Sequence, residues 1–137
     1  MDIEFPIEVI VLGTPISLQA TGGRSKKQWK DSIVEALRIE LPKDCFLSDE
    51  RLDVTIYIFP DGEMEADLDN VIKPILDAMV KVVYLDDNQV DRIVAQRFNA
   101  GFEFQLQEPS PVLSHAVGQE KPLMYLRIHN EPIRTIG

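Results

Sequence analysis

Alternating apolar and polar residues predict a strand at the start of the chain. Apolar side chains occupy every second position from Ile3 to Val11, with glutamates and Pro6 between them. Because proline has no N–H to donate to a neighbouring strand, Pro6 favours an edge strand or a late strand start. We therefore expect a strand over residues 3–12 that ends at Gly13.

Two longer segments have apolar residues at the spacing of a helix. The first runs from about Lys26 to Leu41. Ser25 precedes it and Gln28 follows three residues later, which is the spacing of a capping box. Proline follows at position 42 and predicts the end of this helix. The second helix follows Asp67, and we expect it to bury a stripe of five residues: Leu68, Ile72, Ile75, Leu76 and Met79.

Four further strands and a short helix complete the predicted elements. Residues 52–59 are apolar on both faces, which indicates a central strand. Residues 90–98, 102–106 and 123–129 are also predicted as strands, and Ser110-Pro111 as the start of a short helix to Val117. The expected fold is α/β (α+β), a single domain over residues 1–137. In it a small mixed sheet of about four strands packs against two main helices.

Size and composition limit the class of protein. A chain of 137 residues with 45% hydrophobic residues is sufficient for one domain with its own core. Cys45 is the single cysteine, which excludes a disulfide or a cysteine-based zinc site within one chain and fits a reducing compartment. The amino terminus is acidic, and no apolar run approaches the roughly 20 residues of a membrane helix. We therefore expect a cytoplasmic protein.

The charge is unevenly distributed. The formal net charge is −9, and the acidic residues are concentrated in residues 61–91, where only Lys73 and Lys81 oppose them. A basic cluster around Trp29 predicts the surface that would contact DNA phosphates, although a solvated helix start explains it as simply. This cluster consists of Arg24, Lys26, Lys27 and Lys30. Trp29 itself lies on the apolar stripe of its helix, so we expect it in the core.

Carboxylates and one lysine surround the second predicted helix. Asp67 and Asp69 stand at its start, Lys73 lies one turn further on, and Asp86 and Asp87 follow its end. Oxygen ligands of this kind bind hard divalent cations, with substrate phosphates completing the coordination shell. Helix capping and an ordinary acidic turn explain parts of the same pattern. The spacing therefore leaves both a metal site and a solvated acidic surface open.

The same residues resemble the signature of a known family. The segments DLDNVIKPILDAM, from Asp67 to Met79, and VYLDDNQV, from Val83 to Val90, are similar to the signature of the RusA family of Holliday-junction resolvases. Residues 13–19 also resemble the segment that follows the first strand in that family. The resemblance implies a homodimeric, Mg²⁺-dependent endonuclease, with Mn²⁺ as a possible substitute. Such an enzyme resolves branched DNA, the four-way junction, by paired nicks.

The resemblance also implies roles for individual residues. Asp67, Asp69 and Asp87 match the metal-binding carboxylates, and Asp86 matches the aspartate beside them. Lys73 matches the functional lysine of the family, so the implied catalytic residues are Asp67, Asp69, Lys73 and Asp87. A homodimer would place two such sites on a junction that is itself nearly two-fold symmetric.

The chain departs from the family pattern in three places. Residues 61–66 are acidic where many relatives are basic, and Val80-Lys81 replaces a usual Asn-Gly turn. Residues 101–121 are expected to be an insertion, and residues 130–137 a loose tail. The net charge of −9 keeps a second function open. This is a non-catalytic acidic protein of the same fold that binds a basic partner, or that binds branched DNA without cleavage.

Overall fold

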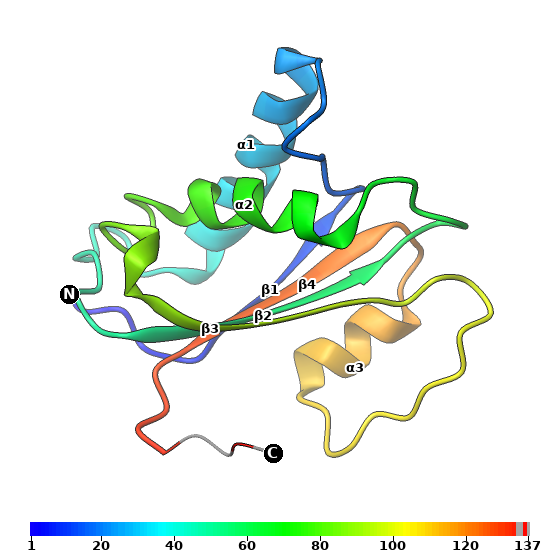
Figure 1. The fold of residues 1–137 in the computed structure, drawn as a ribbon. Coiled ribbons are helices and arrows are strands. Elements are labelled where there is room, and N and C mark those ends of the chain that lie inside the picture. Colours follow the sequence, from blue (N-terminus) through cyan, green and yellow to red (C-terminus); the bar gives the residue numbers. More distant parts are fainter. Residues whose placement is uncertain (134–135, 137) are drawn as a thin grey trace.

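The computed structural model describes residues 1–133 and 136, and it shows a single small α+β domain built on a four-stranded mixed sheet (Figure 1). The strand order is β1-β4-β2-β3; β4 runs antiparallel to both β1 and β2, whereas β2 and β3 are parallel. The elements in chain order are β1 (Ile7–Leu12), α1 (Gly23–Glu40), β2 (Leu52–Phe59), α2 (Leu68–Met79), the 3-10 helix η1 (Asp87–Gln89), β3 (Val90–Arg97), α3 (Pro111–Gly118) and β4 (Leu123–His129).

Helices α1 and α2 cover one face of the sheet and form the main core with it (Figure 1). Ile33 and Leu37 of α1, and Ile75 and Met79 of α2, are fully buried against β2 and β4. The predicted stripe of α2 is partly confirmed, because Leu76 is also buried whereas Leu68 and Ile72 are half-buried at its edge. Trp29 is buried in this core, as predicted.

Helix α3 packs on the opposite face of the sheet and forms a second core (Figure 1). Its start is as predicted, since the Ser110 hydroxyl accepts a hydrogen bond from the Leu113 N–H at 3.1 Å and proline follows it. Leu113 and Ala116 are buried against Phe59, Phe98 and other side chains of the sheet. Because β2 lies between β4 and β3 in the sheet, the prediction of a central strand over residues 52–59 is confirmed.

Three sequence predictions need correction. The first strand begins at Ile7 rather than Ile3 and lies at a sheet edge, in agreement with the position of Pro6. Helix α1 begins at Gly23 after Gly22, so Ser25 lies inside the helix and the predicted capping box is wrong. Residues 102–106 form no strand; the Phe102 ring packs edge-on and the Phe104 ring packs at a tilt against Phe98, and their backbone does not pair with β3.

Two boundary expectations stay predictions. The status of residues 101–121 as an insertion is not decided by the fold, although α3 within them is well formed. The expected loose tail includes residues 134, 135 and 137, which lie outside the described residues. At its start, the Asn130 amide donates hydrogen bonds to the Glu50 carboxylate at 3.1 and 3.2 Å. Within the described residues, no helix has the length and apolar character needed to cross a membrane.

The second core generates a stability prediction. Phe98 is 8% exposed and stacks on Phe59 at 4.7 Å between ring centroids, whereas Phe102 is 51% exposed. Phe98→Ala is expected to lower the free energy of unfolding by about 3–5 kcal/mol, because it leaves a cavity in a packed site. Phe102→Ala, the matched control, is expected to lower it by less than about 1 kcal/mol. Urea unfolding followed by circular dichroism measures both, and equal losses would contradict the assignment of Phe98 to a core.

Candidate active site

Asp67 and Asp69 lie at the start of α2 and point into solvent. Asp67 occupies the N-cap position, but its side chain makes no capping hydrogen bond, so capping does not explain this aspartate. Both carboxylates are exposed, and neither forms a hydrogen bond or an ion pair with any residue in the described part of the chain. Two carboxylates are thus left without a protein partner at the positive end of a helix dipole.

Lys73 links α2 to the turn that carries Asp87. Its Nζ lies 2.5 Å from Asp87 Oδ2 and 2.8 Å from Asp77 Oδ1. These hydrogen bonds, that of Asp77 first, raise the pKa of Lys73 above its ordinary value. The hydrogen bond from Lys73 lowers the pKa of Asp87 below its ordinary value. Lys73 is therefore an ammonium group held between the carboxylates of Asp77 and Asp87.

The turn before β3 is built by Asp86 and Gln89. Asp86 Oδ1 accepts a hydrogen bond from the Asn88 N–H at 3.0 Å, which gives this carboxylate a structural role as the cap of η1. The Gln89 Oε1 atom accepts hydrogen bonds from the N–H groups of Leu85, at 2.9 Å, and Asp86, at 3.3 Å. This is a reciprocal capping box, and it holds Asp87 between its two capping residues.

Gln89 also fixes this turn to the loop before β2. Its Nε2 donates hydrogen bonds to the carbonyl oxygens of Ser48, at 2.8 Å, and Glu50, at 3.1 Å, and the residue is only 8% exposed. Sequence reasoning did not single out Gln89. The signal that could have found it is its spacing of three residues after Asp86, which is the spacing of a capping box.

Tyr84 ties the segment after α2 back to the last turns of this helix. Its hydroxyl donates a hydrogen bond to the Leu76 carbonyl at 2.7 Å, and its ring is fully buried. Burial raises the pKa of Tyr84, and the charges of Asp87, Asp77 and Asp86 raise it further. The three carboxylates are therefore close enough to act on the same phenol through the protein interior.

The aspartate carboxylates near α2 are suitable ligands for a divalent cation, but they are not arranged as a complete metal site. Carboxylate oxygens are the ligands that Mg²⁺ prefers. Within the described residues, however, no three His, Cys, Asp or Glu side chains are arranged to hold one ion. Lys73 engages Asp87, while Asp67 and Asp69 make no contact with them that would form such a group. The convergence of Asp67, Asp69 and Asp87 on one ion, with Asp86 beside them, stays a prediction.

The basic cluster of α1 is connected to the start of α2 through one loop residue. Lys26 Nζ donates a hydrogen bond to the Leu18 carbonyl at 3.0 Å, and the Leu18 N–H donates to the Asn70 carbonyl at 2.7 Å. Lys27 pairs with Asp31 at 3.2 Å on the surface of α1. The cluster Arg24, Lys26, Lys27 and Lys30 therefore adjoins the helix end that presents Asp67 and Asp69. Its predicted contact with DNA is not tested by these contacts.

The residue before Asp67 is also tied to the sheet. Arg97, at the end of β3, donates a hydrogen bond from Nη1 to the Ala66 carbonyl at 3.0 Å. This contact anchors the end of the acidic loop of residues 61–66 at the point where α2 begins.

Comparison with known proteins adds one finding. The family model described as RusA, Endodeoxyribonuclease RusA, matches residues 19–105, more than half of the chain. The matched region contains the basic cluster of α1, the whole of α2 and the Asp86-Asp87 turn, whereas β1, α3 and β4 lie outside it. A search of curated proteins finds no match.

The contact between Lys73 and Asp87 generates a titration prediction. Folding lowers the pKa of Asp87, so this pair stabilises the fold above the unfolded carboxyl pKa of 3.8, and the stabilisation is lost as the pH falls through the lower folded value. Lys73→Gln is expected to return the pKa of Asp87 toward 3.8, because the hydrogen-bonding cation is removed. Carboxyl ¹³C NMR titration measures this shift. Lys27→Gln, on another helix, is the control and is expected to leave the Asp87 titration unchanged.

Gln89 generates a second prediction. Gln89→Ala is expected to lower the free energy of unfolding by about 2–3 kcal/mol, because it leaves buried backbone groups without partners. The same change is expected to move the pKa of Asp87 toward its ordinary value, since the turn loses its support. Asn88→Ala, which keeps every backbone hydrogen bond of the turn, is expected to change stability by less than about 0.5 kcal/mol. Chemical denaturation and NMR titration of both variants provide the check, and an unchanged Gln89→Ala protein would refute the supporting role.

Proposed function

The chain belongs to the RusA family of endodeoxyribonucleases, and on this premise we propose that it is a divalent-metal-dependent nuclease that resolves four-way DNA junctions by paired nicks. The observation that supports the proposal is the position of Lys73. This lysine joins the helix that presents Asp67 and Asp69 to the turn that carries Asp87, and all four residues lie in the matched region.

The metal ligands in this proposal are Asp67, Asp69 and Asp87. Asp67 and Asp69 are exposed and have no protein partner within the described residues, so they are available to a cation without loss of an existing contact. Asp86 supports Asp87 through the cap of η1 and lies beside the ligands. Bound Mg²⁺, or Mn²⁺ in its place, would supply positive charge against the phosphate oxygens and lower the pKa of a water molecule.

Lys73 acts in this proposal as a cation and not as a base. Its pKa is raised by Asp77 and Asp87, so the amine stays protonated at neutral pH and cannot accept a proton from water. It holds the Asp87 carboxylate in place through a 2.5 Å contact. The same ammonium group is placed to stabilise negative charge that develops on a phosphodiester.

Binding of DNA to an acidic chain requires local positive charge. We assign the first contact surface to Arg24, Lys26, Lys27 and Lys30, which adjoin the start of α2 through Leu18. A homodimer with two-fold symmetry would present two sites to a junction of matching symmetry. Because the net charge is −9, binding is expected to depend strongly on divalent cations and on salt.

A junction-nicking assay tests this function. With Mg²⁺, the protein is expected to nick a synthetic four-way junction at paired positions, and removal of the metal with EDTA is expected to abolish the nicks. Asp69→Asn and Asp87→Asn are each expected to reduce the nicking rate by at least about 100-fold while the fold is retained. Asp61→Asn, in the acidic loop before α2, is the matched control and is expected to retain activity.

The same assay separates the alternative function. If the purified protein binds the junction but does not nick it with any divalent metal, the chain is a non-catalytic member of the family. If it fails to bind the junction at all, even with Ca²⁺ present, the proposal of a DNA-acting enzyme is wrong.

A further inference from the structure

Unpartnered cations occur at two places on this acidic protein. Within the described residues, five lysines and arginines make no hydrogen bond or ion pair through their side chains. Two of them, Arg24 and Lys30, belong to the basic cluster of α1. The other three, Arg38, Lys43 and Lys81, line one cavity of about 340 Å³ at the opposite end of that helix. In a chain with 23 acidic residues, this second grouping requires an explanation.

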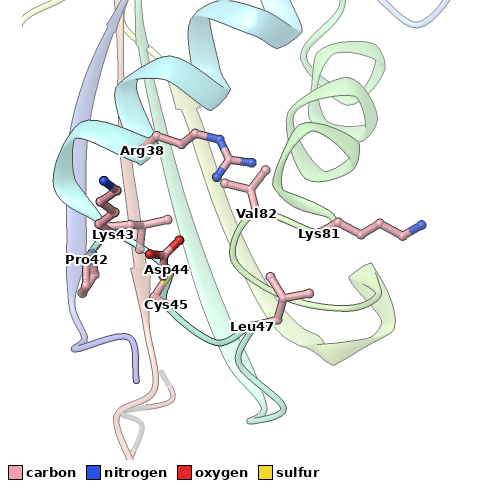
Figure 2. A pocket seen from close by; sticks show the side chains of 9 residues that line it. Arg38, Pro42, Lys43, Asp44, Cys45, Leu47, Lys81 and Val82 are labelled. Atoms are coloured by element: carbon pink, nitrogen blue, oxygen red, sulfur yellow. The ribbon is translucent and has the colours of Figure 1, made fainter. Parts of the chain in front are cut away.

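The cavity lies between the end of α1 and the end of α2 (Figure 2). Arg38 comes from the last turn of α1, Lys43 from the loop that follows it, and Lys81 from the residue after the α2 C-cap. Lys43 and Lys81 stand at opposite sides of the hollow, with the Arg38 guanidinium between them (Figure 2). One carboxylate, Asp44, also lines the cavity, which leaves two net positive charges.

The dipole of α1 explains only one of these cations. A basic side chain in the last turn of a helix is stabilised by the carbonyl end, and this applies to Arg38. Lys43 and Lys81 lie outside the two helices, and no carboxylate in the described part of the chain pairs with either. The Asp44 carboxylate offsets only part of the repulsion among the three cations, and an anionic ligand would offset the rest.

The spacing of the cations indicates what kind of anion fits. A single small anion needs donors that converge on one point, whereas these three cationic groups do not converge, because the Lys81 amine extends away from Arg38 and Lys43 (Figure 2). Lys81 lies beyond the end of α2, in the turn that follows its C-cap, so the last part of the helix separates it from Lys73. The remaining lining, which includes Leu41, Leu47 and Val82, is largely apolar.

We propose that the cavity lined by Arg38, Lys43 and Lys81 is a second phosphate-backbone site, which binds an arm of the same branched DNA whose strand is held at Lys73. The inference rests on the proposed function, because it takes branched DNA as the ligand. It extends that function by placing backbone contacts at both ends of α1. A ligand held at both places spans the surface of α1 and α2, which favours a branched DNA over a short linear duplex.

A salt-dependence measurement tests this site. Binding of a synthetic four-way junction and of a linear duplex is measured with Ca²⁺ over a range of salt concentrations. For Arg38→Gln/Lys81→Gln, the slope of log Kd against log salt for the junction is expected to fall by about 2, with roughly 50-fold weaker binding at 0.1 M salt. Arg92→Gln/Arg127→Gln removes the same charge from the other face of the sheet and is expected to leave the slope unchanged. Circular dichroism verifies that each variant is folded.

Cys45 provides an independent readout, because this single cysteine lines the same cavity. The junction is expected to slow alkylation of its thiol at least several-fold, whereas millimolar inorganic phosphate is not. Full protection by phosphate alone would overturn the proposal in favour of a small anion. The proposal would also be overturned if Arg38→Gln/Lys81→Gln kept the wild-type slope and the junction did not protect Cys45 of the wild-type protein from alkylation. If the wild-type protein nicks the junction in parallel, such a result rejects this site and not the proposed function.

Discussion

The mutual repulsion of carboxylates is the constraint on which this part of the molecule depends. Asp77, Asp86 and Asp87 all act on the buried hydroxyl of Tyr84, so their negative charges gather at the end of α2. Within the described residues, Lys73 is the cation that contacts this group, through Asp77 and Asp87. A chain that concentrates its acidic residues in this way gives up some stability. Such clustering of acidic side chains is common at functional sites, and the chain belongs to a family of endodeoxyribonucleases.

The fold was predictable where one pattern determined one structure. Residues 52–59 are mostly apolar because β2 lies between two strands and contributes side chains to both cores, and this was visible in the sequence. Residues 102–106 also alternate, but alternation records which side chains are buried and not what the backbone pairs with. Phe104 lies in a loop, and its ring packs against Phe98 at 4.6 Å between ring centroids. The alternating phenylalanines therefore contact the second core although their backbone forms no strand.

The candidate site was predictable as a set of residues and less so as an arrangement. The spacing of Asp67, Asp69 and Lys73 follows from their places on one helix, and α2 has them there. The position of Asp87 depends on a turn whose support is Gln89, a neutral residue that hydrogen-bonds to backbone groups some 40 positions earlier. Contacts of this kind leave no periodic pattern in the sequence, so reasoning from residue spacing passes over them.

The four hydrogen bonds of Gln89 distinguish the two halves of the candidate site. They fix the turn that carries Asp87 to the loop before β2. On the other side, Asp67 and Asp69 are unrestrained at their side chains and follow an acidic loop anchored by Arg97 at its last residue. Any closure around an incoming strand would then be asymmetric. The turn of Asp87 would stay in place, and the side chains of Asp67 and Asp69 would rotate toward the ligand.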